Sequence, residues 1–178
     1  MIVLPKRSVT RFFIPLIDVL ILLFCIFLLM PFVSGPPAET TDERFPMIAI
    51  SGRHAYHWHT RTKTAKAPQL HEAAPGVFVA VNEADASRLG ILDGDRVRIV
   101  SRRGSVVAPA KVGDVVPRGV VFVPFHYGDL GEEHAANSLT PDVSDPVSKQ
   151  PVQKIVAVRL ERLEATVSRT WWHAEESR

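Results

Sequence analysis

The chain has 178 residues, 46% of them hydrophobic, with 21 lysines and arginines against 19 aspartates and glutamates. This length predicts one ordinary domain with an appendage. A formal net charge of +2 does not favour a nucleic-acid partner. The single cysteine excludes an intramolecular disulfide, a cysteine-based zinc site and an iron–sulfur cluster held by this chain alone.

An apolar stretch, FFIPLIDVLILLFCIFLLMPFV, occupies residues 12–33 and carries one charge. As a helix it would be about 33 Å long, enough to cross the hydrocarbon core of a bilayer. It is longer than the apolar core of a signal peptide, so we expect a retained transmembrane helix. Lys6, Arg7 and Arg11 precede it. The positive-inside rule then predicts a single-pass membrane protein with a cytoplasmic N-terminus and a globular domain outside the cytoplasm.

The charge in this stretch, Asp18, has two interpretations. It is either a polar residue tolerated near the inner leaflet or a proton-responsive carboxylate that faces a partner helix. The string PLIDVLILLFCIFLL resembles the single span of ExbD/TolR-type biopolymer-transport proteins, over about residues 10–33. In that family the aspartate couples to proton flow, but we expect plain anchoring here.

The rest of the chain alternates between short strand patterns and turns. Residues 34–45, SGPPAETTDERF, predict an extended linker. Asn82 is expected to cap a short helix that Gly90 ends. Six strands with one or two short helices predict an all-β-rich fold, a closed or nearly closed barrel rather than a doubly wound sheet. The expected strands are 47–50, 77–81, 96–101, 105–112, 120–125 and 154–163.

Two long segments, 51–76 and 124–153, show no periodicity and are rich in histidine, threonine, asparagine and aspartate. Loops of this length in a compact domain are usually functional or disordered. Both contain histidines beside aromatic residues, which a solvated linker would lack. We therefore expect two loops that bind a polar ligand.

The first loop offers alternating hydroxyls and cations, which suit an anionic ligand with phosphates. Amide and carboxylate side chains of the second loop, such as Asn137, suit the edge of a nitrogen heterocycle. His57 and His59 are alternative metal ligands, but alternate residues of an extended segment point to opposite sides. We therefore favour hydrogen bonding over metal binding. Neither loop contains a recognisable nucleophile motif.

Five motifs follow one another in a familiar order. They are SGRHAYHWHTRTKT (51–64), NEADASRLGILDGDRVRIVSRRGSVVAPAKV (82–112), RGVVFVPFHYGD (118–129), NSLTPDVSDPVSKQP (137–151) and KIVAVRLE (154–161). Together they resemble the C-terminal molybdopterin-dinucleotide-binding domain of molybdenum oxidoreductases of the dimethyl-sulfoxide-reductase family, with nitrate reductases and formate dehydrogenases most alike. The resemblance covers about residues 46–162 and implies a double-psi β-barrel, followed by a tail at 163–178. We expect Trp171 and Trp172 of the tail to pack on the barrel.

The resemblance also implies the ligand and its contacts. Members of the family bind a molybdopterin guanine dinucleotide. Carried over residue by residue, the implied cofactor contacts are Ser51, Gly52, Arg53, His57, His59, Thr60, Thr62, Thr64, Phe125, Asn137 and Lys154. The chain departs from the family at Arg61 and Lys63, where members often have small uncharged residues. These side chains would either crowd the pterin or add cationic contacts.

The same resemblance implies a partner. Molybdenum enzymes of this family usually take a metal ligand, and commonly an iron–sulfur centre, from earlier domains. Cys25 lies in the apolar stretch, so we expect this chain to provide neither a catalytic residue nor a metal ligand. We expect it to share a molybdenum bis(molybdopterin guanine dinucleotide) with a large subunit that lacks this domain. Two alternatives stay open: a non-catalytic, membrane-anchored interaction or structural barrel, for instance in an ExbD-like complex, or a split-gene remnant.

Overall fold

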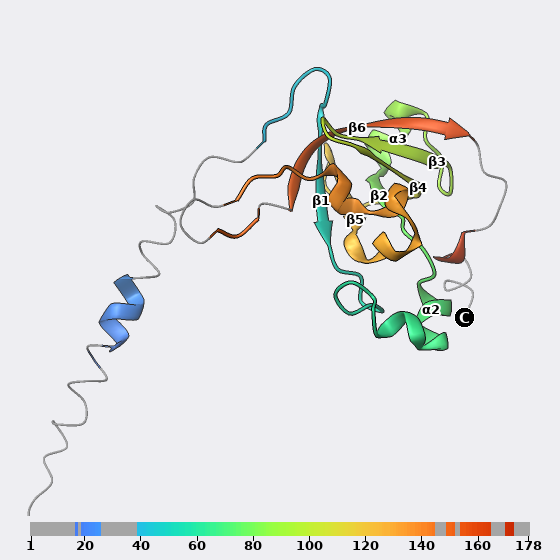
Figure 1. The fold of residues 1–178 in the computed structure, drawn as a ribbon. Helices are drawn as coiled ribbons and strands as arrows, with labels where there is room; N and C mark the ends of the chain where they lie inside the picture. Colours follow the sequence, from blue (N-terminus) through green and yellow to red (C-terminus); the bar gives the residue numbers. More distant parts are fainter. Residues whose placement is uncertain are drawn as a thin grey trace, which may run out of the picture. The chain divides into compact units, whose positions relative to one another are not determined.

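The computed structural model describes residues 17, 19–25, 39–144, 149–151, 154–164 and 170–172 (Figure 1). The chain divides into two compact units, Met1–Pro36 and Pro37–Arg178. In the first, residues 17 and 19–25 are helical and expose their apolar side chains. No helix within the described parts of the chain has the length and apolar character needed to cross a membrane. Most of the span expected at 12–33, Asp18 included, lies outside the described residues.

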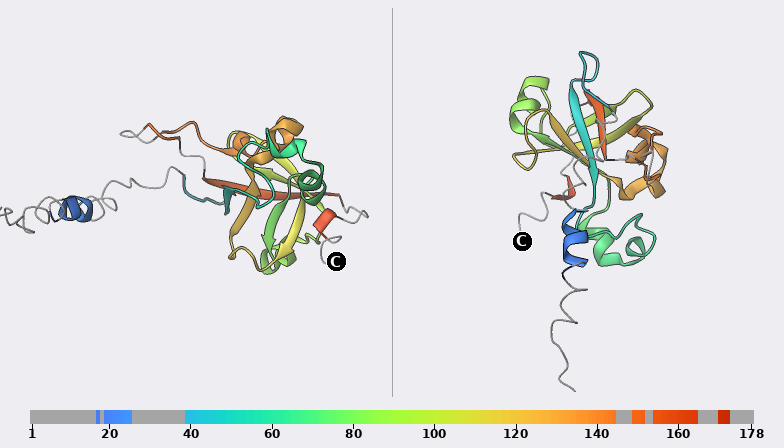
Figure 2. Two further views of the ribbon diagram at one scale, coloured as in Figure 1. Left: turned by 90° about the horizontal axis from the view of Figure 1, so that it is seen from below. Right: turned by 90° about the vertical axis from the view of Figure 1, so that its left-hand side faces the viewer.

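The second unit is built on a closed barrel, which confirms the expected fold (Figures 1 and 2). Its strands follow one another around the barrel in the order β1-β5-β2-β4-β3-β6. They are β1 (Met47–Gly52), β2 (Val79–Asn82), β3 (Arg96–Val100), β4 (Ser105–Gly113), β5 (Val120–Pro124) and β6 (Ile155–Glu164).

The strand pairing has an internal two-fold symmetry. Two pairs are parallel, β1 with β5 and β2 with β4, and the other four pairs are antiparallel. Exchanging β1 with β4, β2 with β5 and β3 with β6 leaves this set of pairs unchanged. The two halves of the chain therefore interlock, and the barrel is of the double-psi type.

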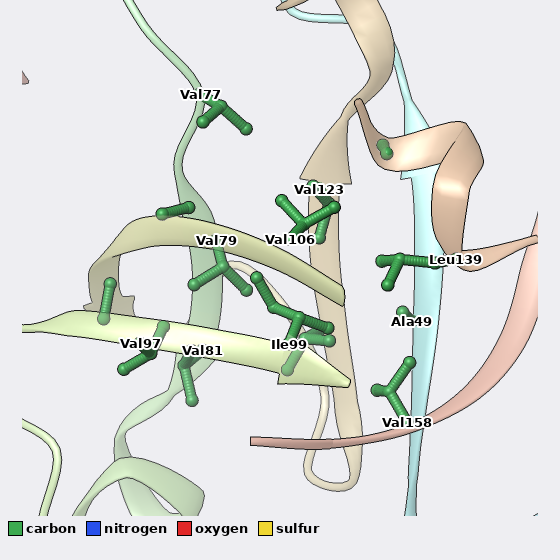
Figure 3. Packing of buried hydrophobic residues seen from close by; sticks show 14 of the residues in the cluster. Ala49, Val77, Val79, Val81, Val97, Ile99, Val106, Val123, Leu139 and Val158 are labelled. Carbon is green, nitrogen blue, oxygen red and sulfur yellow. The ribbon is translucent and has the colours of Figure 1, made fainter. Parts of the chain in front are cut away.

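Small β-branched side chains fill the barrel interior (Figure 3). On β3, Val97 and Ile99 are fully buried while Arg96 and Arg98 are exposed, as expected of a strand with one face on a core. β2 is buried on both faces. Val79 and Val81 point into the main core, and Ala80 lies in a second cluster with Phe78, Val116 and Trp172.

The predicted helix is α3 (Glu83–Leu89), with the expected caps. The Asn82 side chain accepts a hydrogen bond from the Ala84 amide at 3.1 Å, and Gly90 ends the helix with φ of 67°. Sequence analysis did not predict α2 (Pro68–Ala73), whose six residues bury no side chain and so leave no amphipathic pattern. The described parts of the long loops also contain four 3-10 turns: η1 (Thr64–Lys66), η2 (Phe125–Leu130), η3 (Glu132–His134) and η4 (Ala136–Leu139).

Two segments that flank the barrel strands lie against them. In the expected linker, Glu39 forms ion pairs with Arg102 and Arg103 of the β3–β4 turn. Phe45 is 4% exposed, with the Arg102 guanidinium 4.9 Å above its ring. In the tail, Trp172 is 2% exposed and belongs to the second cluster, so the tail packs on the barrel as expected.

Candidate functional site

A groove with two lobes lies where β1 and β5 end. The first lobe, about 230 Å³, is lined by Ser51, Arg53, His59, Thr60, Phe125, Asn137 and Lys154. All seven are among the eleven contacts implied by the family resemblance. The second lobe, about 300 Å³, is lined by Thr60, Thr62, Phe125, His126, Gly128, Asp129, Ala135 and Asn137. The lobes share Thr60, Phe125 and Asn137, so they adjoin, and we refer to the two together as the groove.

The first lobe, which we call the cationic lobe, brings three strand ends together. Ser51 pairs with Val123 in the parallel register of β1 and β5, and its amide donates to the Lys154 carbonyl at 3.2 Å. Arg53 and Lys154 are exposed, and none of the described residues that line this lobe is acidic. Two cations in one lobe attract anionic groups such as phosphates.

In the second lobe, which we call the acidic lobe, Asp129 is the carboxylate among the described lining residues. Asp129 accepts a hydrogen bond from the Arg61 guanidinium at 2.9 Å. Arg61 is 2% exposed and also lies 4.9 Å from the centre of the Tyr127 ring. This arginine therefore lies behind the acidic lobe and is not among the residues that line either lobe. Its φ of 67° matches the small residues that family members often have at this position.

The buried side chain of His126 forms hydrogen bonds to two residues of the first loop. It was not among the predicted contacts. Its Nε2 accepts a hydrogen bond from the His54 amide at 2.7 Å, so Nδ1 carries the proton and donates to the His59 carbonyl. The ring is 1% exposed, and burial lowers the pKa of His126 below its ordinary value of 6.5. A histidine two residues after the strand 120–124 was the available signal.

Three predicted contacts, Gly52, His57 and Thr64, line neither lobe. His57 is 4% exposed, and its Nε2 donates to the Ala74 carbonyl at 2.7 Å. Its Nδ1 then accepts from the Thr64 hydroxyl at 3.1 Å. Burial lowers the pKa of His57 as well, so this ring is a neutral brace of the loop.

Gly52 is required by close packing. A Cβ atom at this position would lie 2.5 Å from the Phe122 ring, so the ring would have to move to admit any other residue. Its backbone therefore runs directly over the aromatic side chain. Throughout the described residues, no group of three or more histidines, cysteines, aspartates or glutamates is arranged to hold a metal ion.

The fold and the groove define a double-psi β-barrel whose loops line a polar groove at one end. The family model for the "Molydopterin dinucleotide binding domain" matches residues 47–157. The chain therefore belongs to the molybdopterin-dinucleotide-binding domain family, as its motifs indicated.

Similar proteins include nitrate reductases and formate dehydrogenases. The chain is 44% identical to a nitrate reductase of Symbiobacterium thermophilum, covering 71% of this chain and 17% of the relative. It is 42% identical to the periplasmic nitrate reductase of Desulfovibrio desulfuricans (70% and 16% covered). It is 38% identical to the F420-dependent formate dehydrogenase subunit alpha of Methanocaldococcus jannaschii (71% and 18% covered). The chain thus spans less than a fifth of the length of these relatives.

Acetylene hydratase from Pelobacter acetylenicus has a similar fold, with a TM-score of 0.59 and 16% sequence identity over 67% of this chain and 18% of that one. At this identity the likeness concerns the fold alone. The expected resemblance to ExbD/TolR-type spans is not supported by these comparisons.

Proposed function

We propose that this chain binds a molybdopterin guanine dinucleotide in its groove and thereby completes the active site of a molybdenum oxidoreductase supplied by another chain. The observation that carries the proposal is the cationic lobe. Seven of the eleven contacts implied by the family motifs come from separate segments of the chain and line this one cavity.

The charge distribution of the groove suits such a ligand. Arg53 and Lys154 in the cationic lobe match a pyrophosphate. In the acidic lobe, the Asp129 carboxylate suits the adjacent N–H donors on the amino-oxo pyrimidine edge that pterin and guanine share. Phe125 borders both lobes and offers an aromatic surface between them. The groove therefore favours one orientation, with phosphates at the cations and a heterocycle at Asp129.

The residues of this chain bind and orient the ligand. The bound molybdenum cofactor would supply the redox centre for oxygen-atom or hydride transfer. The proposal that another chain supplies the rest is supported by the relatives named nitrate reductase and formate dehydrogenase. In those proteins the matching region is 16–18% of a longer chain.

The test is purification of the full chain with its native partners, followed by assay of molybdenum and of fluorescent pterin oxidation products. We expect both, in stoichiometric amounts, together with a large subunit of a molybdenum enzyme. A metal-free and pterin-free preparation without such a subunit would contradict the proposal.

A pair of variants makes the test specific to the groove. Lys154→Ala removes one of the two cations of the cationic lobe. It should reduce the retained pterin about tenfold, the effect of losing a charge-assisted contact. Arg118→Ala is the matched control, because Arg118 is an exposed cation next to the start of β5, whereas the groove lies where β5 ends. It should retain the wild-type amount.

A further inference from the structure

We infer that Trp171, in the tail beyond the family match, is a positioning residue for the groove. It acts through His54 and holds the loop that follows β1, which we call the first ligand loop, in the conformation that binds the ligand. The inference rests on one part of the proposed function, namely that the groove takes a nucleotide-like ligand. The tail lies outside residues 47–157, so the family motifs do not account for it.

Trp171 contacts the first ligand loop directly. Its ring centre lies 5.8 Å from that of His54, and the two planes meet at 79°. The same indole lies 6.0 Å from Phe78 and 5.4 Å from Trp172, also nearly edge to face. Such contacts are favourable and directional, so they restrict where the His54 ring can lie.

His54 is connected to the groove by hydrogen bonds. Its amide donates to His126 Nε2 at 2.7 Å, and His126 Nδ1 donates to the His59 carbonyl. The His59 ring then lies 5.8 Å from that of Phe125, and both residues line the cationic lobe. A displacement of His54 would therefore move the hydrogen bonds that set the position of His59.

A second route of contacts runs through the barrel. Phe78, which touches Trp171, lies 6.1 Å from Phe122, and Phe122 packs on the backbone of Gly52. The chain from Gly52 to His54 thus leaves β1 across an aromatic cluster that Trp171 completes.

Trp172 anchors the aromatic cluster that contains Trp171. Its indole Nε1 donates to Asp93 at 3.2 Å, and its ring is 2% exposed. Trp171 Nε1, in contrast, is buried without a hydrogen-bond partner among the described residues. Leaving a buried donor unpaired is unfavourable, so packing, including the contact with His54, holds this ring where it is.

The test uses the full chain and two measurements. The first is calorimetric titration with guanosine diphosphate. Trp171→Ala should raise the dissociation constant about tenfold, a typical size for coupling between sites. Trp171→Phe keeps an aromatic ring and should restore most of the affinity. The matched control is Val116→Ala, which trims the same cluster. Urea unfolding measures the stability that each variant loses, so that its loss of affinity can be compared with its loss of stability.

The second measurement is amide hydrogen exchange of residues 54–61 without ligand. Trp171→Ala should accelerate exchange there, and Val116→Ala should not. Equal exchange and equal affinity in Trp171→Ala and wild type would overturn the inference. The inference would also be overturned if the loss of affinity were in the same proportion to the loss of stability in Trp171→Ala and in Val116→Ala. If the wild type binds no guanosine diphosphate, the proposed function loses its support, and the exchange measurement still decides the role of Trp171.

Discussion

Buried polar side chains, each with a defined partner, shape the groove from behind. His57 and His126 are 4% and 1% exposed, and each accepts at one ring nitrogen and donates at the other. Such an arrangement requires neutral imidazoles, because a second proton would meet a donor. The groove therefore depends on the protonation of residues that do not contact solvent.

The first prediction concerns pH. Burial lowers the pKa of His57 and of His126 below 6.5 in the folded chain. Between 6.5 and these lowered values the unfolded chain binds more protons than the folded chain. The free energy of unfolding should therefore be at its full value above about pH 7. It should fall as the pH drops below about 6.5, by up to about 1.4 kcal/mol per pH unit for each imidazole.

Urea unfolding between pH 7.5 and 5 measures this dependence. His126→Gln should remove one imidazole's share of the slope. An identical slope in wild type and His126→Gln would contradict the prediction. Glu39 does not interfere in this range. Burial by itself would raise the pKa of Glu39, but hydrogen bonds from Arg103 and Arg102 lower it below its ordinary value of 4.5. The contribution of Glu39 to the free energy of unfolding is therefore lost only below about pH 4.5.

At the scale of elements, short turns rather than long helices build the site. η2 and η4 carry Phe125 and Asn137 to the groove, and the chain after β1 carries Arg53 and His59. At some points the chain that leads into these segments touches the barrel closely. Gly52 is such a point, because it lies against the Phe122 ring of the neighbouring strand.

The second prediction tests this contact. Gly52→Ala should destabilise the protein by about 1–3 kcal/mol, because the new methyl group overpacks against Phe122. Gly76→Ala is the matched control, since no atom lies within 4 Å of the added methyl group. It should be neutral or slightly stabilising. Thermal unfolding of both variants decides: equal midpoints would show that the Phe122 ring yields at no cost.

At the scale of the whole molecule, residues 39–45 are part of the barrel unit, which begins at Pro37. Phe45 is buried, with three guanidinium groups over its ring: Arg102 at 4.9 Å, Arg159 at 5.4 Å and Arg44 at 5.6 Å. Glu39 pairs with Arg102 and Arg103. This strap joins the β3–β4 turn to β6 at the start of the unit. Membrane anchoring by residues 12–33 stays a prediction.

The third prediction concerns this strap. Phe45→Ala should lower the free energy of unfolding by about 3 kcal/mol, as for other buried phenylalanines. Val115→Ala removes an apolar side chain that is 81% exposed and should change it by less than about 0.5 kcal/mol. Urea denaturation measures both. A Phe45→Ala midpoint equal to that of wild type would mean that the strap does not contribute to folding.

The regular elements could be read from the sequence because their signals are local. Alternation in 96–100 reports a strand with one buried face, and Asn82 and Gly90 act on their own helix. α2 could not be read, because a short helix that buries nothing leaves no periodic pattern. Many of the implied contacts meet in one lobe because β1 and β5 end, and β6 begins, at the same end of the barrel.

The sequence by itself determined the barrel, its family and the residue types that face the groove, since strand patterns, caps and motif order are properties of neighbouring residues. The tertiary structure alone decided which loop residues face inward. Arg61 turned behind the groove towards Asp129 and Tyr127, 66 or more positions along the chain. His126 became a brace, and the tail reached His54 through Trp171. These outcomes depend on which distant side chain offers a buried partner, and that information exists only once the chain has folded.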